Sequence, residues 1–155
     1  MYKMALAILT LALLAAAPKR PEIVTIKTSD AIKIAVGGKG EFPLDLKILK
    51  GYHIQANPAS EPHLIATTVK VEPGEGFTAM DPVFPKGIPF KIKGSEKEIS
   101  TYEEELQFRI PLQADESAAV GERTFKGTIR YQGCNATTCF PPTTIPFEAR
   151  IVITK

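Results

Sequence analysis

The chain has 155 residues, enough for one domain with its own hydrophobic core. Hydrophobic residues make up 44% and charged residues 23%, a balance that excludes a disordered chain. The 19 basic and 17 acidic residues give a net charge of +2, which excludes the strongly basic surface of a nucleic-acid-binding protein. The 13 prolines disfavour long helices, and two cysteines are too few for a disulfide-dense scaffold.

The first 17 residues have the pattern of an export signal. Lys3 provides the positive charge, residues 4–14 form an apolar run, and alanines at 15–17 offer a cleavage site. The run is short for a membrane span, yet an uncleaved anchor is the alternative because Pro18 follows the alanines directly. In both cases we expect residues 20–155 to form one domain outside the cytoplasm, touching a membrane only through an uncleaved leader.

Short alternating segments separated by turns follow along the rest of the chain. The clearest has Leu44, Leu46 and Ile48 on one face, as in a half-buried strand. Strands are predicted at residues 22–28, 31–36, 42–49, 52–56, 64–71, 90–93, 102–112, 123–131 and 143–154. Residues 73–89 are rich in proline and glycine and are predicted to be irregular, and residues 95–105 are interpreted as a polar turn leading into a strand. Roughly eight or nine such strands are typical of an all-β sandwich, so we predict one antiparallel two-sheet domain.

The two cysteines, Cys134 and Cys139, lie close together between two predicted strands. Residues 135–138 are expected to form a turn, and Pro141 and Pro142 fix an extended exit. Cysteines at the ends of so short a turn can come within bridging distance. Outside the cytoplasm such a disulfide persists.

Three roles for this cysteine pair are open from the residues alone. A structural bridge across about six residues contributes only about 2 kcal/mol in the chain-entropy model, so a redox-active pair competes evenly with a structural one. A metal site is the third role, but a closed zinc site takes four ligands and neither His53 nor His63 shows ligand spacing to the cysteines. We therefore expect no metal and no cofactor.

The residues around the cysteines resemble a known family. Residues 131–134 (Tyr-Gln-Gly-Cys) and 139–142 (Cys-Phe-Pro-Pro) are similar to the cysteine signature of the N-terminal (alpha) domain of the thiol:disulfide interchange protein DsbD. Residues 50–54 resemble that family's Gly-Tyr strand motif, and residues 81–87 fall where the family has its loop over the active site. The chain departs from the pattern in having one residue fewer between the cysteines and more proline in the loop. Full-length members continue into a membrane domain and a thioredoxin domain, whereas this sequence ends at Lys155, so the expected reductant is a separate protein.

The resemblance implies an immunoglobulin-like antiparallel β-sandwich in the periplasm that performs thiol–disulfide exchange, with a link to cytochrome c biogenesis. It implies that electrons pass from a thioredoxin-like donor to periplasmic disulfide proteins. Cys139 would form mixed disulfides with partners, and Cys134 would resolve them. Phe84, with Asp81 in the same loop, would shield the pair, and Tyr52 and His53 would lie on the neighbouring strand.

Each of these assignments has a plainer alternative. For Phe84 the alternative is simple core packing, because an aromatic residue between prolines in a loop usually packs onto the core. His53 is expected to face solvent or to accept or donate a hydrogen bond, because thiol exchange needs no general base beyond the thiolate. The competing functions are an exported immunoglobulin-like binding module with a purely structural disulfide and a copper-handling protein.

Overall fold

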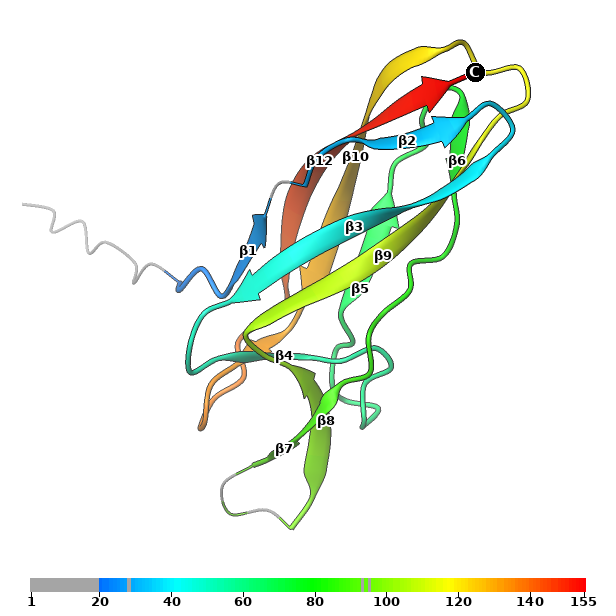
Figure 1. Ribbon diagram of the computed structural model, residues 1–155. Coiled ribbons are helices and arrows are strands. Elements are labelled where there is room, and N and C mark those ends of the chain that lie inside the picture. The colour runs from blue at the N-terminus through cyan, green and yellow to red at the C-terminus, as the bar shows by residue number, and fades with distance from the viewer. Residues whose placement is uncertain (1–19, 28, 93, 95) are drawn as a thin grey trace, which may run out of the picture.

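The computed structural model describes residues 20–27, 29–92, 94 and 96–155. In these residues the regular structure consists of strands, arranged in three four-stranded sheets (Figure 1). No helix in this part of the chain has the length and apolar character needed to cross a membrane. The predicted export signal at residues 1–17 lies outside the described residues.

Two of the sheets form a sandwich, which confirms the predicted all-β, immunoglobulin-like fold. The first sheet has the order β1-β3-β9-β6, made of β1 (Val24–Lys27), β3 (Lys39–Ile48), β9 (Glu105–Ala114) and β6 (Phe77–Ala79). The second has the order β2-β12-β10-β5, made of β2 (Ile32–Ala35), β12 (Thr143–Thr154), β10 (Gly121–Tyr131) and β5 (Thr68–Val71). The pairing of β2 with β12 is parallel, and the other pairings in these two sheets are antiparallel.

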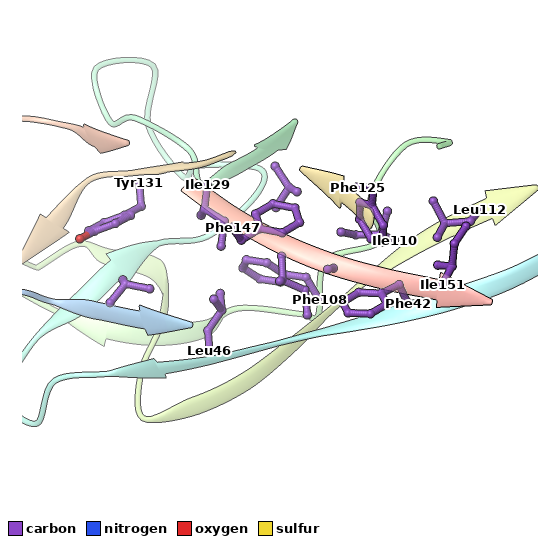
Figure 2. Packing of buried hydrophobic residues seen from close by; sticks show 14 of the residues in the cluster. Phe42, Leu46, Phe108, Ile110, Leu112, Phe125, Ile129, Tyr131, Phe147 and Ile151 are labelled. Atoms are coloured by element: carbon purple, nitrogen blue, oxygen red, sulfur yellow. The ribbon is translucent and has the colours of Figure 1, made fainter. Parts of the chain in front are cut away.

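The core lies between these two sheets, because every second side chain of the long strands points inward. Phe125 on β10 and Phe42 on β3 pack in this core with ring centroids 5.2 Å apart (Figure 2). The ring centroid of Phe125 also lies 5.8 Å from that of Phe77 on β6. Other side chains of the same core are fully or almost fully buried: Leu44, Leu46, Phe108, Ile110, Leu112, Ile129, Ile151 and Ile153.

The third sheet lies at one end of the sandwich (Figure 1) and has the order β11-β4-β8-β7. Its strands are short: β4 (His53–Gln55), β7 (Ile88–Lys91), β8 (Glu98–Tyr102) and β11 (Gly133–Cys134). Strand β11 follows β10 after one residue, so the cysteine segment extends from the end of the long β10–β12 hairpin. This end of the molecule therefore carries both cysteines.

The third sheet is also where the structure differs most from the sequence prediction. Residues 98–102 form β8 within the segment whose polar residues predict a turn at 95–105. Ile99 and Thr101 are buried and pair with β7, and Thr101 also pairs with Gln55 of β4. The strand predicted at 102–112 corresponds to β9 from residue 105 onward. Its first residue, Tyr102, is the last residue of β8, and a corner at which Glu104 has a φ of 56° separates the two strands. Strand β6 and the start of β7 lie within the stretch at 73–89 that was predicted to be irregular.

Candidate functional site

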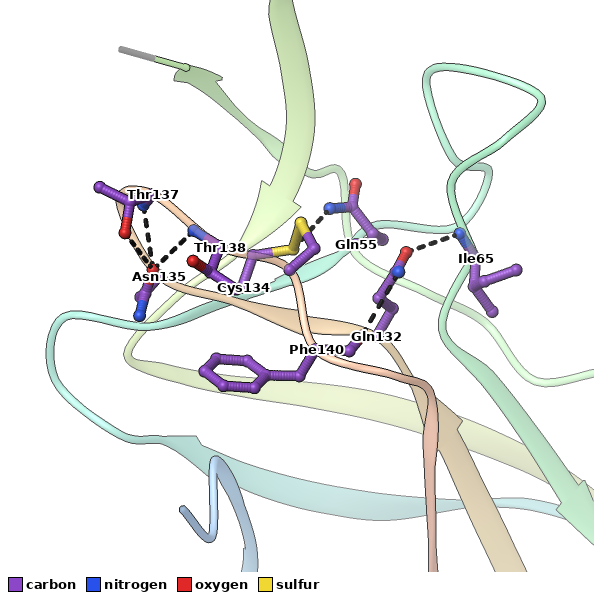
Figure 3. Close-up of a disulfide and its surroundings, with 9 residues drawn as sticks. Gln55, Ile65, Gln132, Cys134, Asn135, Thr137, Thr138 and Phe140 are labelled. Carbon is purple, nitrogen blue, oxygen red and sulfur yellow. Dashed lines mark hydrogen bonds between the residues drawn. A yellow bond between two sulfur atoms is a disulfide. The ribbon is translucent and has the colours of Figure 1, made fainter. Parts of the chain in front are cut away.

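Cys134 and Cys139 form a disulfide at the end of the domain (Figure 3), with an S–S distance of 2.03 Å and Cα atoms 4.0 Å apart. Their backbones form an isolated antiparallel bridge, and the amide of Phe140 donates a hydrogen bond of 2.8 Å to the carbonyl of Gly133. We name residues 133–140 the cysteine hairpin. The short turn brings the two cysteines together as the sequence predicts.

The side chain of Asn135 closes the turn of the cysteine hairpin. Its Oδ1 accepts hydrogen bonds from the amides of Thr137 and Thr138 at 2.9 and 2.8 Å, and from the Thr137 hydroxyl at 3.2 Å. The Asn135 amide donates to the carbonyl of Thr138 at 2.9 Å. An asparagine that bonds the backbone two and three residues ahead fixes a tight turn, so the position of both cysteines is well defined.

The two cysteines differ in their access to solvent. Cys134 is 1% exposed and belongs to the buried residues, whereas Cys139 is exposed. Thiol–disulfide exchange begins when a thiolate reaches one sulfur of the disulfide, so access decides which sulfur is attacked. The hairpin therefore leaves Cys139 accessible to solvent and keeps Cys134 inside.

His53 lies directly opposite Cys134 in the pairing of β4 with β11. Its side chain is 3% exposed, and its ring centroid lies 4.0 Å from that of Phe90 on β7. The expectation that His53 faces solvent is wrong, because β4 is an inner strand between β11 and β8 and Phe90 covers its ring. Burial lowers the pKa of His53, so the imidazole is neutral at pH 7.

Tyr52 directly precedes β4 and is half-buried. Its ring centroid lies 6.1 Å from that of Phe140, the residue that follows Cys139. The structure thus places Tyr52 against Phe140 and His53 opposite Cys134, so both residues lie beside the cysteine hairpin.

Gln55, at the end of β4, is a site residue that the sequence reasoning missed. Its side chain is fully buried, and Nε2 donates a hydrogen bond of 3.5 Å to Sγ of Cys134 (Figure 3). His53 and Gln55 are polar residues on either side of Ile54, a pattern that normally indicates a solvent-facing side of a strand. The signal that could have revealed Gln55 is its position two residues after His53, which places the two side chains on the same face of the strand.

A small pocket of about 70 Å³ lies beside the disulfide. Both cysteines and the turn residues 135–138 form one side of it, and His53, Phe90, Ile92 and Ile99 form the other. Phe90 and Ile92 come from the β7–β8 hairpin (residues 88–102), so this hairpin packs over one side of the disulfide.

The family model described as "Thiol:disulfide interchange protein DsbD, N-terminal" matches residues 23–150. The chain belongs to this DsbD N-terminal domain family. Membership in this family, together with a cysteine pair that forms a disulfide, supports thiol–disulfide exchange as the chemistry of the site.

Two solved structures of N-terminal domains are similar to this chain. The N-terminal periplasmic domain of ScsB from Proteus mirabilis superposes with a TM-score of 0.57 at 14% identity, over 87% of this chain and 49% of that one. The chain thus spans about half the length of that ScsB domain. The reduced N-terminal domain of DsbD from Neisseria meningitidis has 23% identity and a TM-score of 0.44, over 71% of this chain and 79% of that one. Among curated proteins, none matches the sequence significantly.

Residues 81–87, which resemble the loop over the active site in the DsbD family, run beside β9. Val83 forms two backbone hydrogen bonds with Arg109, at 2.8 and 3.0 Å, and Phe84 packs edge-on against Phe108 with ring centroids 4.9 Å apart. Asp81 is exposed. Neither Phe84 nor Asp81 is among the residues that line the pocket beside the disulfide, so their shielding role stays a prediction.

A metal site at the cysteines needs further ligands close to them. Within the described residues, no group of three or more His, Cys, Asp or Glu side chains is arranged to hold a metal ion. His53, the histidine beside the cysteines, is stacked on Phe90.

Proposed function

We propose that this domain is a periplasmic thiol–disulfide exchange module that takes electrons from a thioredoxin-like donor and passes them to periplasmic disulfide proteins. Family membership and the paired cysteines support the reaction type. The resemblance to N-terminal domains of periplasmic redox proteins supports the compartment. The observation that carries the proposal is the difference in burial between Cys139 and Cys134.

Reduction of the module proceeds in two exchange steps. A thiolate of the donor attacks Sγ of Cys139, a donor–Cys139 disulfide forms, and the bond to Cys134 breaks. Cys134 leaves as a thiolate and takes up a proton. The second thiol of the donor then displaces Cys139, so that the donor becomes a disulfide and the module a dithiol that has gained two electrons and two protons.

Delivery to an acceptor runs in the opposite direction. The Cys139 thiolate attacks the acceptor disulfide and forms a mixed disulfide, which Cys134 resolves by attacking Sγ of Cys139. The acceptor leaves as a dithiol and the module returns to its disulfide form. Cys134 needs to reach only Cys139, so its burial does not hinder this step.

The β7–β8 hairpin is a suitable shield and docking surface for these reactions. Phe90 and Ile92 line the pocket beside the disulfide, and Ile88 and Ile92 are 47% and 39% exposed. Apolar side chains at the edge of a reactive group favour contact with a protein partner. We therefore assign the shielding role to Phe90 as a candidate that competes with Phe84.

Trapping of a mixed disulfide tests the proposal. The probe is a thioredoxin-like protein that keeps one active-site cysteine, activated as its thionitrobenzoate disulfide, so that each reaction releases one coloured thiolate. Cys134→Ser should form a stable mixed disulfide through Cys139, at a rate roughly tenfold or more above that of Cys139→Ser, because only Cys139 is accessible. Equal rates for the two variants, or no mixed disulfide with Cys134→Ser, would contradict the proposed polarity of the pair.

A redox titration separates exchange from a purely structural bridge. A midpoint potential in the range of known exchange proteins, above about −300 mV, is expected for a module of this kind. A potential below that value would favour the competing function, an exported binding module whose disulfide is only structural.

A further inference from the structure

The two cysteines are held in the fold in different ways. Cys134 lies in β11 and pairs with His53 of β4, so the third sheet fixes its position. Cys139 is exposed, and in the part of the chain that the structure describes its strand pairing is the isolated bridge to Cys134. The position of Cys139 therefore depends on the cysteine hairpin itself, which is held by the disulfide, by the bond from Phe140 to Gly133 and by the turn at residues 135–138.

Asn135 provides the side-chain contacts of this turn. Figure 3 shows three hydrogen bonds that converge on its Oδ1, from the amides of Thr137 and Thr138 and from the Thr137 hydroxyl. These bonds join the Cys134 side of the turn to the Cys139 side. Hydrogen bonds from an asparagine to the backbone ahead of it favour one conformation of a short loop over the others.

The disulfide and the Asn135 hydrogen bonds depend on each other. In the disulfide form the covalent bond keeps the turn closed, and all three hydrogen bonds are made. In the dithiol form nothing covalent joins the sulfurs, so the outer side of the hairpin gains freedom to open. Thr137 and Thr138 are exposed, so their amides bond water when the turn opens. Loss of the Asn135 side chain therefore costs the disulfide form more than the dithiol form.

We propose that Asn135 is a positioning residue that favours the disulfide form of the site, because its side chain holds Cys139 close to Cys134. Linkage requires that the side chain stabilises the disulfide by as much as the disulfide stabilises the hydrogen bonds of the side chain. The inference rests on the proposed function and adds to it a means of setting the reduction potential. A dithiol whose disulfide form is favoured is the stronger reductant, so Asn135 would support the delivery of electrons to an acceptor disulfide.

Titration of Asn135→Ala with dithiothreitol is the principal test. The protein disulfide breaks, two hydrogens pass from dithiothreitol to Cys134 and Cys139, and dithiothreitol becomes a cyclic disulfide, so one S–S bond is lost and one is gained. We expect the equilibrium constant for reduction to be about threefold to tenfold larger than in the wild-type protein. At about 30 mV per tenfold, this change makes the potential less negative by about 15–30 mV.

Two further variants show whether the hydrogen bonds at Oδ1 cause the shift. Asn135→Asp keeps a side-chain oxygen that accepts the same bonds, so it should restore the wild-type potential. The comparison is made at about pH 7, where thiols of ordinary pKa, about 8.5, are mostly protonated and the added charge has little thiolate to repel. Asn57→Ala is the matched control, because Asn57 is also partly buried and bonds the carbonyl of Thr67 at 2.8 Å outside the cysteine hairpin. It should keep the wild-type potential.

The outcomes separate this inference from the proposed function. A wild-type disulfide that dithiothreitol cannot reduce would contradict the exchange function itself. An unchanged potential in Asn135→Ala, or an equal shift in Asn135→Asp or in Asn57→Ala, would overturn the role of Asn135 and leave the exchange function in place.

Hydrogen exchange tests the same inference without any reduction step. Cys134→Ala/Cys139→Ser cannot form the disulfide, and in it the amides of Thr137 and Thr138 should exchange with solvent at least threefold faster than in the oxidised wild-type protein. The amide of Val83, which bonds the carbonyl of Arg109 outside the cysteine hairpin, should exchange at the same rate in both proteins. Equal rates for Thr137 and Thr138 in the two proteins would show that their bonds to Asn135 do not depend on the disulfide, which would overturn the inference. Should the variant not fold, the reduced wild-type protein is measured instead.

Discussion

Burial favours the neutral form of the His53 side chain. The residue pairs with Cys134 across β4 and β11, its ring packs against Phe90 on β7, and burial lowers the pKa of His53. A histidine whose pKa is lower in the folded than in the unfolded protein binds fewer protons when folded. The free energy of unfolding must then decrease as the pH falls through the ordinary histidine pKa of about 6.5 towards the lower folded value.

Replacement of His53 should remove this pH dependence. We expect His53→Phe to flatten the loss of unfolding free energy between about pH 7 and 5, a slope of at most about 1.4 kcal/mol per pH unit for one proton. Urea unfolding followed at several pH values measures it. His63→Gln is the control, because it replaces the other histidine at an exposed position. A slope unchanged in His53→Phe would show that another group causes the acid sensitivity.

The sequence pattern around the cysteines predicted the disulfide, since a four-residue turn between two strands leaves few other arrangements. The same pattern could not reveal Gln55. Polar residues at alternate positions normally mark the solvent side of a strand, whereas His53 and Gln55 are both buried in β4, an inner strand of the third sheet. The contact of Gln55 with Cys134 joins residues separated by 79 positions, which no local pattern encodes.

At the level of elements, the β7–β8 hairpin combines the features of a shield. It reaches the disulfide through Phe90 and Ile92, and it is held to the domain by β8, whose Tyr102 hydroxyl donates to the carbonyl of Pro85 at 3.0 Å. Along its length several side chains are exposed, Ile88 and Ile92 among them. A two-stranded extension with a partly exposed apolar face is easier to displace than the sandwich core.

Phe90 and Phe84 are both candidates for the residue that shields the disulfide, and alanine substitutions distinguish them. Phe90→Ala should raise the rate of disulfide reduction by dithiothreitol roughly threefold or more, because it opens the side of the disulfide that the pocket residues cover. Phe84→Ala should leave this rate unchanged and instead lower the free energy of unfolding by about 2 kcal/mol, because Phe84 packs on Phe108. If the reduction rate increased in Phe84→Ala alone, residues 81–87 and not Phe90 would be the shield of the disulfide.

The strands that were predicted correctly share a physical property that the others lack. Strands β3, β9, β10 and β12 are long and have one buried face, so apolar residues recur at every second position. Strand β6 has three residues and depends on pairing with β9. Strand β8 has five residues, and charged residues precede and follow it in the sequence. Such short strands are stabilised by tertiary pairing rather than by their own pattern, so a single sequence does not disclose them.

The aromatic core and the disulfide lie in different regions of the molecule. The sandwich core is centred on Phe125, which meets Phe42, Phe77 and, at 6.2 Å, Phe147. The third sheet lies at the end of the sandwich (Figure 1). It carries the disulfide, whose neighbours are His53, Gln55 and Phe90. No residue of this aromatic cluster lines the pocket beside the disulfide.

This separation predicts that stability and redox potential respond to different substitutions. Phe125→Leu leaves a gap between the two sheets and should lower the free energy of unfolding by about 1–2 kcal/mol, which lowers Tm by about 3–8 °C in a chain of this size. The midpoint potential of the disulfide should stay at the wild-type value, because the folded environments of Cys134 and Cys139 are unchanged and both redox forms lose the same core contacts. Thermal unfolding of the oxidised and reduced proteins, with the dithiothreitol titration, measures both quantities on one sample. If the midpoint potential changed together with Tm, the core would be coupled to the site. The sandwich would then have to differ in stability between the oxidised and reduced proteins.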